Sequence, residues 1–378
     1  MSKLRTGVTT GLSAAGAAKA AMIALLSPTA QTVDEVTVFS TYGQELTLAI
    51  TETSFEGDWV KCGVVKDGGD DPDVTSGLTV YCAVAKSAGT GVELDGGEGI
   101  GRVTKPGLKV AVGQAAINPV PRAMISAAIA EVCELYAYTG GIKAVVSIPG
   151  GEEVAKKTLN ARLGVIGGLS VLGTTGIVEP MSDQALLDTV KTELDVCMAS
   201  GIERLLIMPG NYGRDFARDE LGLDTSECIR CSNFIGETLE YAVEREVPKA
   251  VLIGHAGKLV KLAGGIMNTH SKYADCRMEI IAAHAALANA GPALIGQIFQ
   301  CVTTEAAIDL LVAAGINEAV WQSIGKRIEF YLGEKTKHQL DLEFVVFTQE
   351  HGVLVEGALS RADKSGTGKG TAPRGKND

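Results

Sequence analysis

Short apolar runs that end in proline or glycine are the feature that most constrains how this chain can fold. Three of them stand at KAVVSIP (143–149), RLLIMPG (204–210) and KAVLIGH (249–255). Such runs are typical of strands buried on both faces of a parallel sheet. Amphipathic segments separate them, and in Ser182–Ser200 the apolar side chains share one helical face, with Ser182 as a cap. The alternation predicts an α/β doubly wound (Rossmann-like) domain whose ligands bind beyond the carboxyl ends of the strands.

In the first 140 residues, helical and strand-like segments do not alternate one by one. One helix is expected from the Thr9–Gly11 turn to Pro28, and another from Asn118 to about Tyr138. Strand-like runs stand between them at 36–40, 46–51, 59–65 and 78–85. These patterns predict an α+β N-terminal domain over residues 1–140, then the α/β domain over 141–358, which a hairpin at 342–357 closes. Residues 359–378, nearly without large apolar side chains, are expected to be a disordered tail.

Composition limits the class of function. The formal net charge of −11 over 378 residues disfavours binding to nucleic acid or to an anionic membrane. No stretch reaches the roughly 18–20 apolar residues of a transmembrane span, and Lys19 interrupts the N-terminal apolar run, so no signal peptide is expected. Eight scattered cysteines are typical of reduced thiols, which predicts a cytoplasmic protein. The sequence is compatible with a homo-oligomer.

Positive charge gathers in two segments of this acidic chain. Residues 1–33 hold Lys3, Arg5 and Lys19, and residues 99–122 hold Arg102, Lys105, Lys109 and Arg122, and neither segment contains an acid. Arginine forks and lysine ammonium groups suit the carboxylates of a small polyanionic ligand. The alternative interpretation is a basic, solvated loop surface.

Two motifs are rich in polar chemistry. TGVTTGLSAAGAAKAA (6–21) leads a Gly/Thr turn into a helix, which either offers N–H groups to an anion or is an ordinary capped helix. KDGGDDPDVTSG (66–77) carries four aspartates, but its spacing is not that of an EF-hand loop, and an Asp-rich turn explains much of it. We therefore predict no protein metal site and consider Asp70 and Asp71 for proton transfer or hydrogen bonding.

Glycine-rich turns follow apolar runs at 149–151, 173–176, 209–211 and 254–257. In a doubly wound sheet such turns meet at one edge and form a nucleotide-sized crevice, although glycine also simply ends strands. His255 and His270 lie in polar, loop-like surroundings, where an acid or base role competes with a structural one. Cys228 and Cys231 form a C-x-x-C without a second pair at zinc-like spacing, so structural thiols are expected.

Taken together, these segments resemble the cobalt-precorrin-5B C(1)-methyltransferase family. The resemblance is carried by LRTGVTTGLSAAGAAKAA, VKDGGDDPDVTSG, GEGIGRVTKPGLKVAVGQAAINPVPR, GGLSVLGTTGIVEPMS, MPGNYGRDFA, CSNFIG and VLIGHAGKLVKLAGGIMNTHSKYAD. It extends in order from residue 4 to about 357. It implies methylation of carbon 1 of cobalt-precorrin-5B by S-adenosylmethionine, giving cobalt-precorrin-6A in anaerobic cobalamin biosynthesis. Cobalt then arrives inside the corrin substrate.

If the chain is such a methyltransferase, its motifs supply candidate residues for each role. The candidates for a general base are His255, His270, Asp70 and Asp71. Those for substrate carboxylates are Thr9, Thr10, Lys19, Arg102, Lys105, Asn118, Arg122 and Lys258. Those for S-adenosylmethionine are Gly150, Gly151, Gly173, Thr174, Thr175, Gly176, Gly210 and Asn211. The usual methyltransferase pattern of an acid and G-x-G-x-G is missing at Val145–Gly151, so the cofactor position rests on topology.

Two other classes of protein compete with this interpretation. A non-catalytic carrier of tetrapyrrole intermediates would have the same cationic segments but no affinity for S-adenosylhomocysteine. A nicotinamide oxidoreductase would have an α/β domain, but no G-x-G-x-x-G stands at a strand-to-helix turn in this chain.

Overall fold

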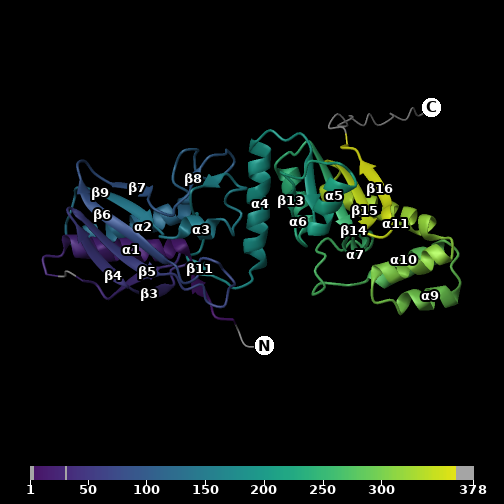
Figure 1. Cartoon of the computed structure of the whole chain (residues 1–378), viewed down its shortest axis with the longest axis horizontal. Helices are drawn as coiled ribbons and strands as arrows, with labels where there is room; N and C mark the ends of the chain where they lie inside the picture. Colours follow the sequence, from purple (N-terminus) through teal and green to yellow (C-terminus); the bar gives the residue numbers. More distant parts are fainter. Residues whose placement is uncertain (1–3, 30–31, 363–378) are drawn as a thin grey trace, which may run out of the picture. The chain divides into compact units, whose positions relative to one another are not determined.

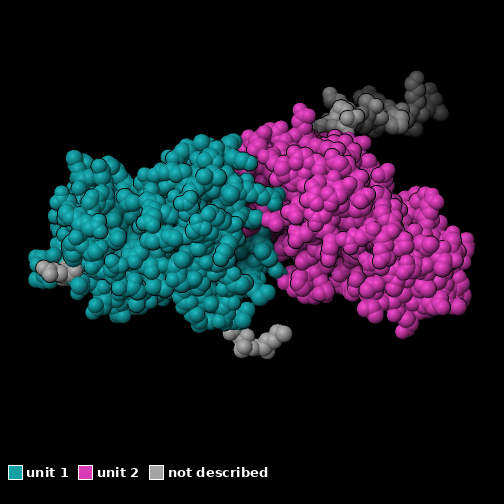
Figure 2. All heavy atoms as spheres, in the orientation of Figure 1, with its two compact units in different colours: residues 1–186 teal, residues 187–378 magenta. Residues whose placement is uncertain are grey.

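The structure is a computed structural model that describes residues 4–29 and 32–362. The chain forms two compact units, Met1–Leu186 (unit 1) and Leu187–Asp378 (unit 2), coloured separately in Figure 2. This division differs from the expected boundary at residue 140, because strand β9 (Gly141–Ser147) pairs with two strands of unit 1. Both units mix helices with sheets.

Unit 1 is built on a five-stranded sheet in the order β4–β5–β6–β9–β7. The other strands are β4 (Glu52–Glu56), β5 (Trp59–Val65), β6 (Thr79–Ser87) and β7 (Val92–Gly96). Neighbours run antiparallel except β7 and β9, which run parallel. The apolar run at 143–149, expected in the parallel sheet of the second domain, is therefore part of a mixed sheet in unit 1.

Helices α1 (Thr10–Leu26) and α2 (Pro119–Leu135) pack on each other, and α1 also packs on β5 and β6 (Figure 1). The hairpin of β2 (Glu35–Phe39) and β3 (Glu45–Ala49) covers α1 further. Because α1 is enclosed on nearly every side, its sequence is dominated by buried alanines such as Ala14, Ala17 and Ala20. Small side chains let the surrounding elements approach closely.

Two short antiparallel ladders complete unit 1. Strand β1 (Gly7–Val8) pairs with β11 (Ile177–Val178), and β8 (Arg102–Val103) pairs with β10 (Val165–Ile166). A short helix, α3 (Gly151–Ala155), follows β9. The ladders hold the end of unit 1 against segments much earlier in the sequence, including the chain's N-terminal strand.

Unit 2 is built on a sheet in the order β13–β12–β14–β15–β16. Its strands are β12 (Leu205–Met208), β13 (Ile229–Arg230), β14 (Lys249–His255), β15 (Asp341–Thr348) and β16 (Gly352–Leu359). All neighbours are parallel except β15 and β16, which form the expected hairpin. The predicted parallel strands at 204–210 and 249–255 are thus confirmed. The chain passes from β12 to β13 on one side and returns to β14 on the other, so the strand order reverses between β12 and β14.

The helices of unit 2 pack around this sheet, and residues of both form the core of the unit. These helices are α4 (Asp183–Ala199, begun in unit 1), α5 (Asn211–Asp219), α6 (Ile235–Glu244), α7 (Ala256–Leu259), η1 (Val260–Gly264), α8 (Arg277–Leu287), α9 (Pro292–Phe299), α10 (Thr304–Ala313) and α11 (Asn317–Thr336). Trp321 of α11 and Phe344 of β15 are among the fully buried side chains of one large cluster. No helix in the described ranges combines the length and apolar character needed to cross a membrane.

The predicted tail begins inside the folded unit. Leu359 ends β16, and the Arg361 Nε–H donates to the carbonyl oxygen of Gln339 at 2.6 Å. The Arg361 backbone N–H donates to Asp341 Oδ1 at 2.5 Å. These contacts correct the predicted start of the tail at 359, and its remaining part, 363–378, lies outside the described residues.

Candidate functional site

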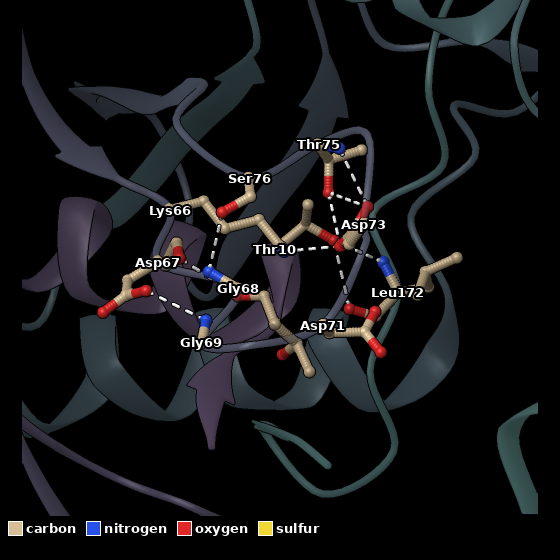
Figure 3. Close-up of polar contacts among 12 residues, drawn as sticks. Thr10, Lys66, Asp67, Gly68, Gly69, Asp71, Asp73, Thr75, Ser76 and Leu172 are labelled. Atoms are coloured by element: carbon tan, nitrogen blue, oxygen red, sulfur yellow. Dashed lines mark hydrogen bonds and ion pairs between the residues drawn. The ribbon is translucent and has the colours of Figure 1, made fainter. Parts of the chain in front are cut away.

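The acidic turn at residues 66–77 is held by hydrogen bonds among its own residues (Figure 3), and it is also tied to the N-terminal segment of unit 1. The Arg5 guanidinium pairs with the Asp67 carboxylate, and the Arg5 backbone N–H donates to Asp70 Oδ2 at 2.6 Å. Asp71 Oδ1 accepts the Met181 backbone N–H at 2.9 Å. Each of these carboxylates therefore contacts an N–H group of the chain, and the turn joins three segments that are distant in sequence.

A buried ion pair lies at the base of this turn. Lys66 is 2% exposed, and its Nζ lies 2.6 Å from Asp73 Oδ2. Burial raises the pKa of Asp73, but hydrogen bonds from Lys66 and from the backbone and hydroxyl of Thr75 outweigh it and lower the pKa below 3.8. The hydrogen bond from Arg5 lowers the pKa of Asp67 to about 2. Lys66 was not predicted as a site residue, because a lysine at a strand end is normally exposed.

The predicted anion site at the start of α1 is occupied by protein groups. The Thr9 hydroxyl accepts the Leu12 N–H at 3.2 Å, and the Gly11 N–H donates to the Leu172 carbonyl at 3.1 Å. The Thr10 hydroxyl donates to that same carbonyl at 3.1 Å. Lys19 pairs with Glu131 at 2.6 Å, away from the helix start. Thr9, Thr10 and Lys19 thus make internal contacts that are sufficient to explain them.

The cations of residues 99–122 divide into two kinds. Arg102 makes two hydrogen bonds of 2.9 Å with Asp95, so the expected lack of a counter-acid is wrong: the acid lies just upstream of the segment. The Arg122 Nε–H and Nη1–H donate to the carbonyls of Ile117 and Leu94 at 2.9 and 3.1 Å, which fixes it to the backbone. Asn118 is the N-cap residue of α2. Lys105 packs its side chain over Gly164.

The glycine-rich turns predicted to share one edge belong to different units. Gly150–Gly151 and Gly173–Gly176 lie in unit 1, whereas Gly210–Asn211 lies in unit 2. A Cβ added to Gly151 would stand 2.5 Å from the Gly99 carbonyl oxygen, and one on Gly173 would meet the Thr9 side chain at 2.4 Å. Thr41 donates its hydroxyl to the carbonyl of Thr174 and its backbone N–H to that of Thr175. These glycines are required where segments of unit 1 pack closely.

In unit 2, polar groups gather where the strand order reverses. Gly210 lies after β12 and is the N-cap residue of α5, which begins at Asn211. His255 is the last residue of β14. Lys258 donates from Nζ to the carbonyls of Pro209 and Ser232, linking the chain beyond β12 to the chain beyond β13. Burial lowers the pKa of Lys258. The lysine therefore joins the ends of these strands.

Both candidate histidines have their ring orientation set by backbone N–H groups. His255 Nδ1 accepts the Gly257 N–H at 3.2 Å, and His270 Nδ1 accepts the Lys272 N–H at 3.0 Å. An Nδ1 that accepts leaves the neutral ring protonated at Nε2. His255 Nε2 lies 3.1 Å from Glu305 Oε1, and burial lowers the pKa of this histidine although Glu305 raises it. Neutral His255 and His270 are thus Nε2–H donors in this arrangement.

A polar cavity of about 320 Å³ lies next to these groups in unit 2. Its lining includes Asn233, Lys261, Thr269, His270, Asp275 and Arg277. Of these, only His270 was predicted as a site residue. The others were missed because they come from three separate segments, and only the runs CSNFIG and VLIGHAGKLVKLAGGIMNTHSKYAD hinted at their importance.

Unit 2 combines parallel strands with a polar cavity beyond their carboxyl ends. This combination is typical of enzymes that act on small charged molecules. The CbiD family model matches residues 1–180, and the model of the CbiD C-terminal domain matches residues 268–358. The cobalt-precorrin-5B C(1)-methyltransferase of Ruminiclostridium cellulolyticum is 49% identical over 92% of this chain and 89% of its own length. The chain belongs to the CbiD family, as the resemblance predicted.

Two other relatives named for the same activity agree with this assignment. The proteins of the same name from Thermoanaerobacter sp. and Moorella thermoacetica are 44% and 47% identical, over 94% and 86% of this chain and 95% and 87% of their own lengths. The crystal structure of the cobalamin biosynthesis protein (cbiD) from Archaeoglobus fulgidus is 27% identical, covers 75% of this chain and 85% of that one, and matches with a TM-score of 0.39.

Proposed function

We propose that this chain transfers the methyl group of S-adenosylmethionine to carbon 1 of cobalt-precorrin-5B and releases cobalt-precorrin-6A in anaerobic cobalamin biosynthesis. The observation that carries the proposal is the nearly full-length match to relatives named for this activity, at up to 49% identity. The sulfonium C–S bond breaks as the C–C bond forms, its electron pair stays on sulfur as S-adenosylhomocysteine leaves, and the substrate loses one proton. Cobalt belongs to the substrate.

The methyl transfer depends mainly on how the two reactants are oriented. A displacement at a sulfonium methyl requires no enzyme nucleophile, and holding two reactants in line can supply roughly 7–11 kcal/mol of the barrier. The proton leaves for a base, for which we favour Asp70 or Asp71 over the histidines. A carboxylate that accepts one N–H retains further lone pairs, whereas Nδ1 of His255 and of His270 is already an acceptor and Nε2 carries the proton.

We assign the donor to unit 2 as a doubly wound, Rossmann-like domain. Parallel sheets bind ligands where the strand order reverses, and in this sheet that point lies between β12 and β14. Gly210 and Asn211 stand there and keep their predicted role in donor binding. The turns at 150–151 and 173–176 belong to unit 1, so the position of the reversal in strand order no longer supports their role in donor binding.

We assign the corrin substrate chiefly to unit 1. Its acetate and propionate arms require cations at the surface, and the Arg102 side chain is 47% exposed beside Asp95. Lys105 lies in the same segment. Arg122 and Lys258 are less suited to this role, since backbone carbonyls already engage their donors. For the same reason, Thr9 and Thr10 support the fold of this unit more than they support binding.

We place the reaction in the cytoplasm. Cys62 and Cys82 stand opposite each other on β5 and β6, both buried as free thiols, and burial raises the pKa of Cys82 to about 12. Thiols that stay reduced at such positions are typical of a reducing compartment.

The direct test is to supply the purified protein with cobalt-precorrin-5B and S-adenosylmethionine carrying a labelled methyl group. We expect label in a product with the mass of cobalt-precorrin-6A, and S-adenosylhomocysteine in equal amount. Reactions without protein or without the donor are the controls. A carrier would bind the tetrapyrrole but release no S-adenosylhomocysteine, and that result would replace the proposal.

A further inference from the structure

The polar cavity of unit 2 is formed beyond the carboxyl ends of the two strands that flank β12 in the sheet, β13 and β14. Asn233 comes soon after β13, Gly257 comes directly after β14 and its cap, and the loop 268–277 supplies most of the remaining wall. The Thr269 N–H donates to the Asn233 carbonyl at 3.0 Å, which holds this loop to the segment after β13. The cavity therefore lies beside the reversal of strand order, on the edge where parallel sheets bind ligands.

Both signs of charge line this cavity. Lys261 is 5% exposed, and its Nζ lies 3.9 Å from Asp275 Oδ1. Arg277 makes two hydrogen bonds with Asp275, of 2.5 Å from Nε and 2.9 Å from Nη2. Two cations and one carboxylate give the lining residues one net positive charge, and Glu305 acts on Arg277 from outside the lining. Burial lowers the pKa of Lys261, as expected for an ammonium group with little access to water.

The internal contacts of these side chains leave donors and acceptors for a ligand. The Lys261 ammonium donates to the carbonyls of Thr269 and Ala274 at 3.1 and 2.9 Å, which uses two of its three N–H bonds. The contacts with Asp275 use two of the five N–H bonds of Arg277. Each Asp275 oxygen that accepts from Arg277 has a second lone pair. Cationic donors and an anionic acceptor thus stand within one small cavity.

We propose that this cavity binds the amino-acid end of S-adenosylmethionine, with the α-carboxylate on Arg277 and Lys261 and the α-ammonium on Asp275. A zwitterion requires both charges side by side, which the lining provides. An acetate or propionate arm of the corrin carries only negative charge, so it would give Asp275 no partner of opposite charge. The inference rests on the proposed function, because that function supplies the ligand. It moves the donor's polar end from the predicted glycine-rich turns to the loop 268–277.

Calorimetry with two thioethers tests this assignment. S-adenosylhomocysteine carries the amino-acid end, and 5′-methylthioadenosine shares its adenosine and thioether but lacks that end. In Arg277→Gln and in Asp275→Asn we expect roughly tenfold or greater loss of affinity for S-adenosylhomocysteine, the size of one lost charge-assisted hydrogen bond. Affinity for 5′-methylthioadenosine should stay at the wild-type value in both variants.

Arg218→Gln is the matched control. Arg218 also pairs with an adjacent acid, Asp219, at 2.7 and 2.9 Å, but it does not line the cavity, so this variant should bind both thioethers like the wild type. An equal loss for both thioethers in Arg277→Gln would overturn the assignment, and so would weakened corrin binding with S-adenosylhomocysteine unaffected. Unchanged binding in both cavity variants, with methyl transfer intact in the wild type, would reject this site and leave the proposed function standing. A wild type that neither binds S-adenosylhomocysteine nor transfers methyl would reject both.

Discussion

The acidic turn of unit 1 and the polar cavity of unit 2 use similar residues for different ends. In the turn at 66–77, Arg5 and Lys66 pair with two of the four aspartates, Asp67 and Asp73. The other two, Asp70 and Asp71, each accept a backbone N–H group. Among the residues that line the cavity, Lys261 and Arg277 stand beside one acid, Asp275, and keep unused donors. A cluster in which every charged group has a partner within the fold mainly supports the fold. A cluster that keeps unused hydrogen-bond donors beside a cavity is suited to a ligand.

The largest effect that separates the two regions should come from Gly69→Ala. Gly69 has a φ of +66°, and a Cβ there would stand 2.3 Å from the Arg5 carbonyl oxygen, so the turn cannot keep its place against the N-terminal segment. We expect a loss of about 3–5 kcal/mol in the free energy of unfolding, measured by urea titration. Gly77→Ala is the control: its φ is +84° but the space beside it is open, so it should cost only about 1–2 kcal/mol. Equal effects would contradict the close-packing argument.

The next effect concerns the buried pair of the turn. Asp73→Asn removes the carboxylate that faces the Lys66 ammonium, and a buried charge without its partner costs about 3–5 kcal/mol. Because Asp73 is partly exposed, we expect about 2–4 kcal/mol in the same titration. Asp95→Asn, which breaks the exposed pair with Arg102, should cost no more than about 1 kcal/mol. If the two variants lost similar stability, burial of Lys66 would not be the cause.

The two arginines of the cationic segment should also differ. Arg122→Met removes hydrogen bonds to backbone carbonyls, and we expect a loss of about 1–3 kcal/mol of stability. Arg102→Met should leave the melting temperature nearly unchanged but raise the Michaelis constant for the corrin roughly tenfold, through one lost charge-assisted hydrogen bond. Thermal unfolding and steady-state kinetics on both variants measure the two effects. A reversed pattern would exchange the roles assigned to these residues.

The smallest effect is a difference in pH response. In unit 1 the pKa of Asp67 is lowered to about 2 and that of Asp73 below 3.8, so their stabilisation is present above about pH 4 and is lost as pH falls through the folded values. In unit 2, burial lowers the pKa of His255 and His284 below 6.5, so the unfolded chain binds more protons and stability falls once pH drops below 6.5. Urea titrations at several pH values on the wild type and on His284→Gln measure how much the buried histidine contributes to this loss. The variant should lose less stability than the wild type between about pH 7 and 5.

Local patterns in the sequence predicted the elements that they encode by themselves. The first helix was expected between the Thr9–Gly11 turn and Pro28, and α1 occupies Thr10–Leu26, because its cap and its stop are local signals. The strand at 59–65 coincides with β5. Pairing was less predictable: the run at 143–149 has the composition of a buried parallel strand, but composition does not specify a neighbour, and β9 joins the mixed sheet of unit 1.

The candidate site was harder to predict than the fold, for a related reason. The absence of an acid between residues 99 and 122 suggested unpaired cations, yet Asp95 reaches Arg102 from β7. Lys261, Asp275 and Arg277 carry no motif of their own, and they meet only because η1, α8 and the loop between them converge. Spacing along the chain identifies a turn or a cap, whereas a cavity depends on segments that the fold brings together.

The pairing of β1 with β11 has a consequence for how the protein becomes folded. Gly7 pairs with Val178, so the first strand of the chain finds its partner only after nearly all of unit 1 has been synthesised. Closing so long a loop costs entropy before any contact rewards it, which slows folding. During translation strand β1 therefore remains without its partner strand while helix α1 already has the strands on which it packs. An element made early in unit 1 is thus among the last to be fixed.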